Sequence, residues 1–384
     1  METRTGAFWP APTQEHLLRA ALLRGPAAVR AWETWSAQTA LEALDTGSFR
    51  LLPLLYENLH AEGVAAPSMD KLKGIYRYHW SKNQVLFHQV AGVLDRLHAA
   101  GLQTLVLKGA ALATLYYPNP GLRPMGDFDV LVPLHQAAAA AEVLAGAGWA
   151  PLLERPLRAF TPAYFSIRPG HGFRNAARQE CDLHWHVFFQ ACWPEADAPF
   201  WQAARPLAFR GRATLALNPA DQLLHLCTHC TLWNPVPSIR WVADAVWLLR
   251  AVSVEWDRLV AQARTLGLSL HALETLAYLR GQFEAPVPEA VLAQLRAAPV
   301  SNLERWAYRS WANPPDWRSA GAQLATQYRL YSAAGRGYWG LGHVGGALRF
   351  LQNLWGLDHR RHVPRVLWHK LGEWWRNRRL FSSG

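Results

Sequence analysis

The sequence is short of cysteine, of lysine and of long apolar runs, and each shortage excludes a class of protein. Four cysteines in 384 residues are too few for a disulfide-stabilised scaffold, which agrees with a reducing compartment. No apolar run reaches the ~18 residues that a membrane-spanning helix requires. The first residues, Met1–Arg4, lack the basic and apolar regions of a secretory signal. We therefore expect a cytoplasmic protein without a transmembrane segment.

The charged residues are predominantly basic, and most of the basic ones are arginine. The chain has 39 lysine and arginine residues against 28 acidic ones, a net charge of +11, but only five of them are lysine. A basic surface favours polyanionic partners such as NTPs, nucleic acid or anionic lipid. The preference for arginine over lysine looks like a general compositional bias, so the charge is a weak argument for any one partner.

Helical periodicity dominates both ends of the chain. Apolar residues recur at helical spacing through residues 13–62 and again from about Met69 to Ala99, after which Gly101 provides a stop signal. From about Asn218 onward only helical signals remain. At 51% hydrophobic and 17% charged residues the chain is globular, and its length exceeds what one compact core usually serves.

Between the helical ends the pattern changes to that of strands alternating with helices. Thr104–Leu107 is a short apolar run that predicts a buried strand. Further strands are predicted at 127–132 and 179–189, and helices at 110–117 and 134–147. This order predicts an α/β unit with a mixed sheet. We therefore expect an α+β fold with three regions: N-terminal helices (1–99), the α/β core (100–215) and a C-terminal helical domain (216–384).

Three aspartates of the predicted strands form a candidate metal site. Asp127 and Asp129 are two residues apart on one strand, so both side chains lie on the same face. Asp182, on a neighbouring strand, would complete a site for two divalent cations that clamps a phosphoryl displacement. An isolated Asp-x-Asp pair that faces solvent is the competing interpretation.

Basic residues near the aspartates favour the phosphoryl-transfer interpretation. Lys108-Gly109 ends a strand and begins a helix, where backbone N–H groups and the helix dipole attract phosphate. Lys108 would add a positive charge for a triphosphate. Arg123, four residues before Asp127, would neutralise the leaving pyrophosphate.

Four segments together resemble a known family. They are LVLKGAAL (105–112), RPMGDFDVLV (123–132), CDLHW (181–185) and IRWVAD (239–244). The combination resembles the "uncharacterised nucleotidyltransferase" family of the polymerase-β superfamily, over roughly residues 50–250. The Lys-Gly and Arg…Asp-x-Asp portions are also similar to AbiEii-type toxin nucleotidyltransferases.

The resemblance implies a Mg²⁺-dependent nucleotidyltransferase that moves a nucleoside monophosphate from an NTP such as ATP to an acceptor hydroxyl. Asp127, Asp129 and Asp182 would bind two Mg²⁺ ions, with Mn²⁺ as an alternative, and Asp182 would activate the acceptor hydroxyl. Lys108 and Gly109 would replace the usual Gly-Ser turn. The sequence departs from the superfamily pattern because neither 110 nor 111 is serine or threonine. A further departure is Gly126, which stands where a serine is common, and we expect it to contact the substrate.

Several histidines have two interpretations. His184 and His186 share the predicted strand face of Asp182, so either would contact a metal-bound phosphate or orient Asp182, or else close the edge of the core. For His184 we expect a substrate-binding role. His171 is predicted in a loop near the site.

Two further pairs of residues lie on the helices that follow the α/β unit. His225 and His229 share a helix face, and packing explains them and the neighbouring cysteines better than zinc binding does. His225 is nevertheless close enough in the chain to reach the site. Arg240 and Asp244, at i and i+4, predict a structural ion pair.

The acceptor and the role of the C-terminal tail remain open. An RNA or tRNA end, a protein side chain or a small molecule would each fit as acceptor. The alternative function is a catalytically degenerate nucleotide-binding or scaffold protein in a biosynthetic or membrane-associated assembly. The basic, tryptophan-rich tail predicts RNA stacking, weak contact with a membrane surface, or a helix that buries its tryptophans and solvates its arginines. The last interpretation is favoured.

Overall fold

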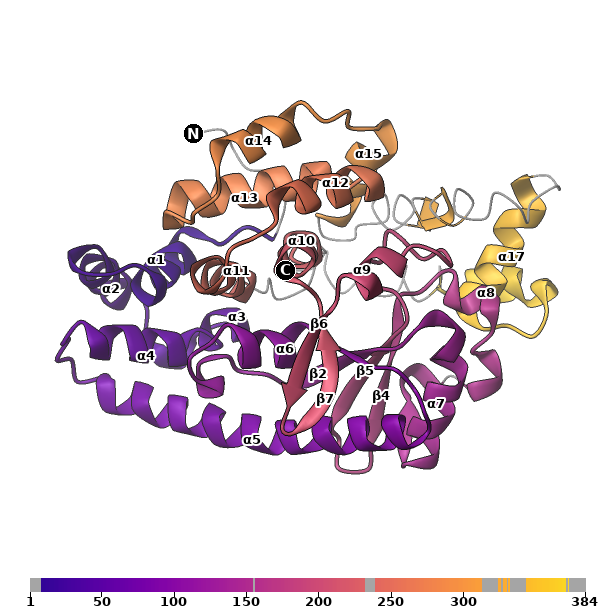
Figure 1. Ribbon diagram of the computed structural model, residues 1–384, viewed down its shortest axis with the longest axis horizontal. Helices are drawn as coiled ribbons and strands as arrows, with labels where there is room; N and C mark the ends of the chain where they lie inside the picture. The colour runs from indigo at the N-terminus through magenta and orange to yellow at the C-terminus, as the bar shows by residue number, and fades with distance from the viewer. Residues whose placement is uncertain are drawn as a thin grey trace.

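A seven-stranded mixed sheet lies at the centre of the molecule, between helices that cover both of its faces (Figure 1). The computed structural model describes residues 8–154, 156–231, 239–312, 324–325, 327–329, 331, 343–370 and 372. Mixed strand directions combined with helices before, within and after the sheet confirm the expected α+β fold.

The strands are ordered β3-β4-β5-β2-β1-β7-β6. β2 runs parallel to β5 and β1 runs parallel to β7, whereas the other neighbouring pairs are antiparallel. The strands are β1 (Leu105–Leu107), β2 (Asp127–Leu131), β3 (Trp149–Pro151), β4 (Gly170–Asn175), β5 (Glu180–His184), β6 (Arg205–Phe209) and β7 (Arg212–Ala216).

The predicted strands β1, β2 and β5 are present, but the sequence did not predict β3, β4, β6 and β7. β5 ends at His184, so His186 lies beyond the strand and does not share its face with Asp182. β4 has the sequence GHGFRN, whose glycines replace the apolar residues that would have marked a strand.

The N-terminal helices are α1 (Pro12–Leu22), α2 (Pro26–Gln38), α3 (Thr46–Phe49), α4 (Leu52–Ala61) and α5 (Met69–Ala99). The predicted bounds of the last helix are confirmed. Its buried positions include Leu86, Val90, Leu94 and Leu97, which recur at helical spacing on the face that meets the sheet. Gly101 follows with φ of +71°, the left-handed conformation that glycine adopts most readily.

Further helices connect the strands and form the C-terminal half. Within the sheet region they are α6 (Lys108–Leu115), α7 (Ala137–Gly146), α8 (Pro162–Phe165) and α9 (Ala198–Gln202). The helices that follow are α10 (Pro219–His229), α11 (Arg240–Ala251), α12 (Trp256–Leu266), α13 (Ser269–Phe283), α14 (Glu289–Arg296), α15 (Asn302–Trp311) and α17 (His343–Trp355). Among the described residues, no helix is long and apolar enough to cross a membrane.

Strand alternation gives the sheet two different faces. Val106, Val130 and Leu183 belong to the hydrophobic cluster that includes α5 and α7, on the lower side of the sheet in Figure 1. Asp129 and Asp182 are next to Val130 and Leu183 in their strands. Their side chains therefore lie on the opposite face of the sheet, towards α10 and α11. The polar residues of the candidate site are thus gathered on the side of the sheet that the C-terminal helices cover.

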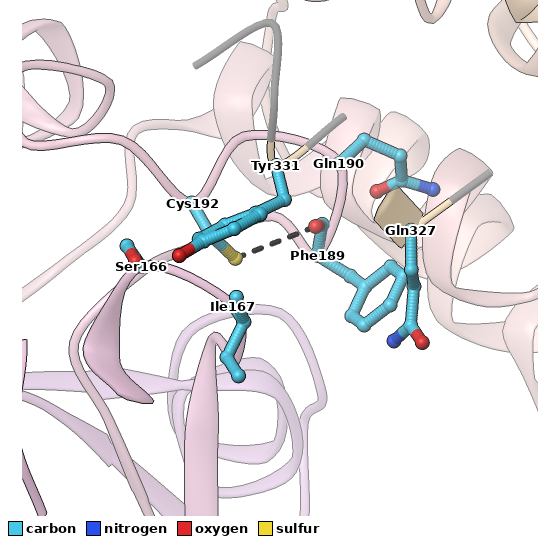
Figure 2. Close-up of a pocket in the computed structure, with 7 residues that line it drawn as sticks. All are labelled: Ser166, Ile167, Phe189, Gln190, Cys192, Gln327 and Tyr331. Atoms are coloured by element: carbon cyan, nitrogen blue, oxygen red, sulfur yellow. Dashed lines mark hydrogen bonds between the residues drawn. The ribbon is translucent and has the colours of Figure 1, made fainter. Parts of the chain in front are cut away.

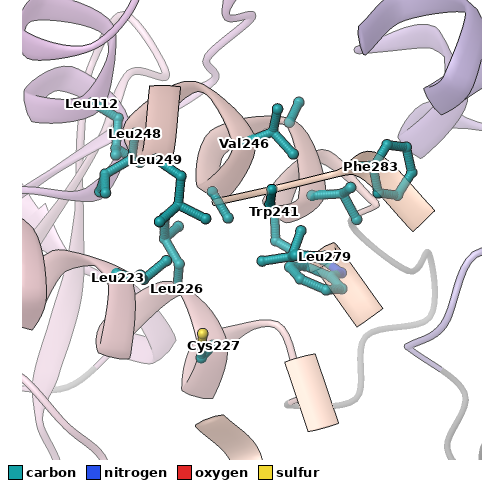
Figure 3. Close-up of a cluster of buried hydrophobic side chains, with 14 of the residues drawn as sticks. Leu112, Leu223, Leu226, Cys227, Trp241, Val246, Leu248, Leu249, Leu279 and Phe283 are labelled. Atoms are coloured by element: carbon teal, nitrogen blue, oxygen red, sulfur yellow. The ribbon is translucent and has the colours of Figure 1, made fainter. Parts of the chain in front are cut away.

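A second hydrophobic cluster joins these C-terminal helices to the rest of the chain. Figure 3 shows part of it, where Leu112 of α6 lies near Leu248 of α11, and side chains of α10 and α13 pack against other parts of α11. The same cluster includes Leu17 and Leu18 of α1. In contrast, Phe350 and Leu354 of α17 belong to the cluster beneath the sheet. The division into three regions at residues 99 and 215 stays a prediction.

Candidate active site

Parallel pairing of β2 and β5 brings two carboxylates together. Asp129 is paired with Asp182, and Leu131 with His184. Side chains at paired positions lie on the same face of a sheet, so His184 follows Asp182 along that face. Asp127 lies at the exposed first position of β2, next to Glu180. The structure therefore places all three predicted aspartates on two adjacent strands, with Asp129 and Asp182 at the middle position of each.

Lys108 extends from the end of β1 to the same carboxylates. Its Nζ donates to Oδ1 of Asp129 at 2.6 Å and lies 3.3 Å from Nε2 of His184. The same Nε2 is 3.1 Å from Oδ1 of Asp129, so the three groups form a triangle. Lys108 has φ of +45°, a left-handed conformation that is unusual for a residue other than glycine. The backbone strain is located where β1 turns into α6, directly beneath the site.

The charges of this triangle shift the acidity of its members. Burial opposes ionisation of Asp129, but Lys108 and then His184 outweigh it and lower the pKa of this carboxyl. Burial likewise opposes the charge of Lys108, and the neighbouring Asp129 reverses this effect and raises the pKa of the ammonium. Burial and then the negative charge of Asp129 raise the pKa of Asp182. Asp129 is therefore the carboxylate that is most firmly ionised.

Asp129, Asp182 and His184 form a group that fits a divalent cation. One ligand atom from each residue lies within 4.8 Å of the others. The ammonium of Lys108, which contacts both Asp129 and His184, shows that this space accepts a positive charge. Asp127 is outside the group, so its predicted role as a metal ligand stays a prediction.

Two glycines of β4 leave space beside these residues. Gly170 is paired with His184, and Gly172 with Asp182. A Cβ at Gly170 would lie 2.9 Å from Nδ1 of His184, and one at Gly172 would lie 3.0 Å from Oδ1 of Asp182. Real Cβ atoms do not approach so closely. A side chain at either glycine would thus collide with His184 or Asp182, and also with the backbone oxygen of Leu183 or with Leu152.

Arg123 precedes the site but is engaged by the helical region. Its Nε and Nη2 donate to the two carboxylate oxygens of Asp244 in α11, at 2.7 and 2.8 Å. Tyr117 donates to the same carboxylate at 2.7 Å. Both ionic side chains are almost fully buried. Burial opposes the charge of Asp244, but Arg123 outweighs it and lowers the pKa of this carboxyl.

The remaining nitrogen of Arg123 points to the start of α6. Nη1 is buried and has no hydrogen-bond partner within the described part of the chain. A Cβ at Gly109 would lie 2.7 Å from this nitrogen and 3.0 Å from Sδ of Met125. The guanidinium of Arg123 therefore packs against Gly109, in the place that a side chain there would occupy. Gly126, by contrast, is exposed, and a Cβ there would meet nothing within 4 Å.

The prediction that Arg240 forms an ion pair with Asp244 is wrong, because each residue has another partner. Asp244 is paired with Arg123, and Arg240 donates through Nη1 to the backbone oxygen of Pro124. Burial and then the positive charge of Arg123 lower the pKa of Arg240 to about 10. The helical spacing identified two residues close to the site but not the contacts that they make.

Two histidines of α10 are close enough to the site for its charges to act on them, as the sequence argument allowed for His225. The helix begins at Pro219, after Asn218, whose side chain accepts from the N–H of Asp221 at 3.0 Å. Near its other end the rings of His225 and His229 are 5.6 Å apart. Desolvation is the largest cause of the lowered pKa of both imidazoles, and Lys108 acts in the same direction. Their i, i+4 spacing had already placed them on one helix face.

The other two histidines of the sequence argument have structural contacts. His171 lies in β4 and not in a loop, and its ring contacts the hydroxyl of Tyr164 at 2.8 Å and the backbone oxygen of Leu152 at 2.9 Å. His186 is fully buried, where it contacts Asp197 and, at 3.1 Å, the backbone oxygen of Phe165. Neither belongs to the group that fits a cation. The same holds, within the described residues, for the cysteines of α10.

The pocket in Figure 2 is separate from the carboxylates. Its volume of about 20 Å³ holds little more than one water molecule. None of the predicted site residues lines it. Cys192, which does, points its Sγ at the backbone oxygen of Phe189 at 3.4 Å. The pocket is lined by Ser166, Ile167, Phe189, Gln190, Cys192, Gln327 and Tyr331.

A larger, basic hollow lies at the C-terminal tail. It has a volume of about 430 Å³ and is lined by Arg349, Gln352, His359, Arg360 and Arg361. Beyond it Trp368 is 79% exposed, so the interpretation that the tail buries its tryptophans is wrong for this residue. The remaining tryptophans and arginines of the predicted tail, from residue 373 onward, lie outside the described residues.

Comparisons with known proteins identify the family of the chain. The sequence model of a protein family described as uncharacterised nucleotidyltransferase matches residues 48–302. Among solved structures, an antigenic nucleotidyltransferase-like protein from Paracoccidioides brasiliensis is similar at a TM-score of 0.35 and 14% identity, over 54% of this chain and 96% of the other. That likeness is too low to support an argument. No curated protein matches the sequence. The similarity to AbiEii-type toxins stays a prediction.

Proposed function

Because the chain belongs to the family of uncharacterised nucleotidyltransferases, we propose that it transfers a nucleoside monophosphate from an NTP to an acceptor hydroxyl. The observation that carries the proposal is the pairing of Asp129 with Asp182 on one sheet face, with Nζ of Lys108 2.6 Å from Oδ1 of Asp129. Phosphoryl transfer needs positioned charge more than covalent chemistry, and these residues provide charge of both signs.

The cation site is assigned to carboxylates on β2 and β5. Asp127, Asp129 and Asp182 would hold divalent cations, for which the family resemblance suggests two Mg²⁺ ions. When bound, such cations supply a clamp for the attacking and leaving oxygens of the displacement. Asp129 would bind a cation in its ionised form, because Lys108 and His184 keep its pKa low.

The residues around the cation site have separate roles in the transfer. The acceptor oxygen attacks the α-phosphorus, the bond to the bridging oxygen breaks, and pyrophosphate leaves. Asp182, whose pKa is raised by burial, takes the proton of the acceptor hydroxyl. Lys108 leaves Asp129 for the triphosphate.

Arg123 and its neighbours form the phosphate-binding part of the proposal. Arg123 is fixed by Asp244, so it stabilises the pyrophosphate only through Nη1, at the start of α6. Gly109 gives Nη1 its place, and the exposed Gly126 leaves room for substrate before β2. His184 keeps its proposed contact with substrate phosphate as an alternative to direct contact with a cation.

The acceptor is proposed to be RNA, because the basic hollow at Arg349, Arg360 and Arg361 and the exposed Trp368 together suit a phosphate backbone with unstacked bases. A protein side chain or a small molecule is the alternative acceptor. Weak attachment to a membrane surface through the tail would use the same charges.

The test is transfer of α-³²P label from each of the four NTPs, with a divalent cation and a cell lysate as the acceptor pool. We expect a labelled product that is absent with Asp129→Asn and with Asp127→Asn, while circular dichroism shows that both variants are folded. Loss of the label on treatment with RNase, and not with protease, would identify RNA. If no NTP gives label although nucleotide binds, the chain is the catalytically degenerate binding protein.

A further inference from the structure

We propose that His184 is a direct ligand of the divalent cation, and that the donor set of two carboxylates and one imidazole selects Mn²⁺ over Mg²⁺. The inference deepens the proposed function, on which it rests for the role of the cation in transfer. It concerns binding in the absence of any nucleotide, and so it is testable separately from activity.

The first argument is the position of the imidazole. His184 and Asp129 are each less than one-tenth exposed, and Asp182 is half-buried beside them. Ligand atoms of all three lie within 4.8 Å of one another, a spacing that a single cation can bridge. Nε2 is the nitrogen that faces Asp129, at 3.1 Å from Oδ1. Nε2 of the ring thus points towards the carboxylate of Asp129.

The second argument is the ammonium that already lies between these donors. Nζ of Lys108 is 2.6 Å from Oδ1 of Asp129 and 3.3 Å from Nε2 of His184. An ammonium has no acceptor, so this contact is a hydrogen bond in the tautomer in which Nε2 carries the lone pair, whereas the contact of Nε2 with Oδ1 of Asp129 is one when Nε2 carries the proton. A cation bound to the same two atoms would take the place of this ammonium. Lys108 is therefore a stand-in for the cation, and it must move when the cation binds.

The third argument is the space that β4 leaves. Gly170 and Gly172 are paired with His184 and Asp182, and a Cβ on either glycine would lie within 3.0 Å of its partner side chain. Two glycines at alternate positions of one strand leave the same face of that strand without side chains. Glycine at both positions therefore lets Asp182 and His184 keep these places, with Cδ1 of Leu152 also packed 2.7 Å from the Cβ position of Gly172.

The choice of cation follows from the donors. Mg²⁺ prefers oxygen ligands and keeps much of its water, whereas imidazole nitrogen suits first-row transition ions. Mn²⁺ accepts carboxylate oxygen as readily as Mg²⁺ does, and it also accepts imidazole. In the tautomer that presents the Nε2 lone pair, the proton lies on Nδ1, which is buried without a partner among the described residues, so the bound cation has to offset this unmet donor. An imidazole in this position therefore favours Mn²⁺.

The experiment measures Mn²⁺ binding to the full chain without nucleotide. Loss of the free Mn²⁺ signal in electron paramagnetic resonance gives the affinity, and addition of Mg²⁺ gives the competition. Electron spin echo modulation then detects a nitrogen nucleus bound to Mn²⁺. We expect binding of Mn²⁺ about tenfold or more tighter than that of Mg²⁺, with modulation from one imidazole nitrogen.

The variant His184→Asn keeps a polar side chain but removes the imidazole. It should lose the nitrogen modulation and most of the preference for Mn²⁺, while still binding both cations through its carboxylates. The matched control is His135→Asn, a change at an exposed histidine away from the sheet face, which should leave both results unchanged. Should His184→Asn fail to fold, His184→Gln is the second variant for the same two measurements.

Two results would overturn the inference: equal affinity for Mn²⁺ and Mg²⁺ in the unaltered chain, or nitrogen modulation that persists in His184→Asn. Persistence would point to His225 or His229 as the nitrogen donor. Mn²⁺ bound through His184 without any nucleotide transfer would leave the inference standing and defeat the proposed function. Either of the two overturning results, alongside transfer that depends on Asp129, would defeat the inference and leave the proposed function standing.

Discussion

Arg123 and Asp244 form a buried, two-pronged ion pair between the segment that leads into β2 and helix α11. Nε lies 2.7 Å from Oδ1 and Nη2 lies 2.8 Å from Oδ2, and the residues are 121 positions apart in the chain. The pair links the strand that carries Asp127 and Asp129 to the C-terminal helices. Its neighbours Tyr117 and Arg240 make the link part of a polar cluster beside the site.

Breaking this pair from one side should destabilise the fold. We expect Arg123→Leu or Asp244→Leu to lower the free energy of unfolding by about 3–5 kcal/mol, because each leaves a buried charge without its partner. The double variant should cost clearly less than the sum of the two. Urea unfolding of the four proteins measures the coupling, and additive effects would contradict it.

The control for that cycle is the exposed pair Arg205–Glu255, in which both side chains are more than half exposed. Arg205→Leu should change the free energy of unfolding by no more than about 1 kcal/mol, since water screens surface pairs. A loss as large as that of Arg123→Leu would mean that burial is not the cause.

The pair also predicts how stability depends on pH. The pKa of Asp244 is lower in the folded protein than its ordinary value, because Arg123 outweighs the effect of burial. The stability from this group is therefore present above about pH 4 and is lost as the pH falls through the lowered pKa. The stability difference between the unaltered chain and Asp244→Leu should narrow below pH 4. A difference that is constant from pH 6 to the lowest pH at which the protein folds would contradict this.

Gly109 should not tolerate alanine, although alanine is the better helix former. A Cβ there would lie 2.7 Å from Nη1 of Arg123, whose guanidinium is fixed by Asp244. We expect Gly109→Ala to lower the thermal midpoint and to reduce transfer. Gly281→Ala in α13 is the matched control. No atom lies within 4 Å of its Cβ position, so it should stabilise by about 0.5–1 kcal/mol. Equal effects of the two changes would show that Arg123 gives way.

Removal of the ammonium at the site should separate cation binding from transfer. Lys108→Met deletes the charge that lies 2.6 Å from Asp129, so Mn²⁺ should bind more tightly when nucleotide is absent. Transfer should fall, with a higher KM for NTP, since the triphosphate loses a positive charge. Lys73→Met, at an exposed position of α5, is the control. Weaker Mn²⁺ binding to Lys108→Met would mean that Lys108 supports the cation site and does not compete for it.

Local sequence determined the parts of the structure in which a short stretch decides its own conformation. Helix α5 has the predicted bounds because its buried residues recur at helical spacing and a left-handed glycine follows it. The alternation around Asp127 and Asp129 was enough to predict a strand with both carboxylates on one face. The Lys-Gly pair marked the turn from β1 into α6.

Only the tertiary structure decided which of these groups meet. Parallel pairing of β2 with β5 puts Asp129 beside Asp182 and brings His184 to Lys108, contacts that span up to 76 positions. Asp244 pairs with Arg123 and not with Arg240, which the spacing within one helix could not reveal. Strand β4 escaped prediction because its glycines carry no hydrophobic pattern. A side chain at these glycines would clash with Asp182 or His184 on the neighbouring strand. Local periodicity holds no information about which residues lie on a neighbouring strand.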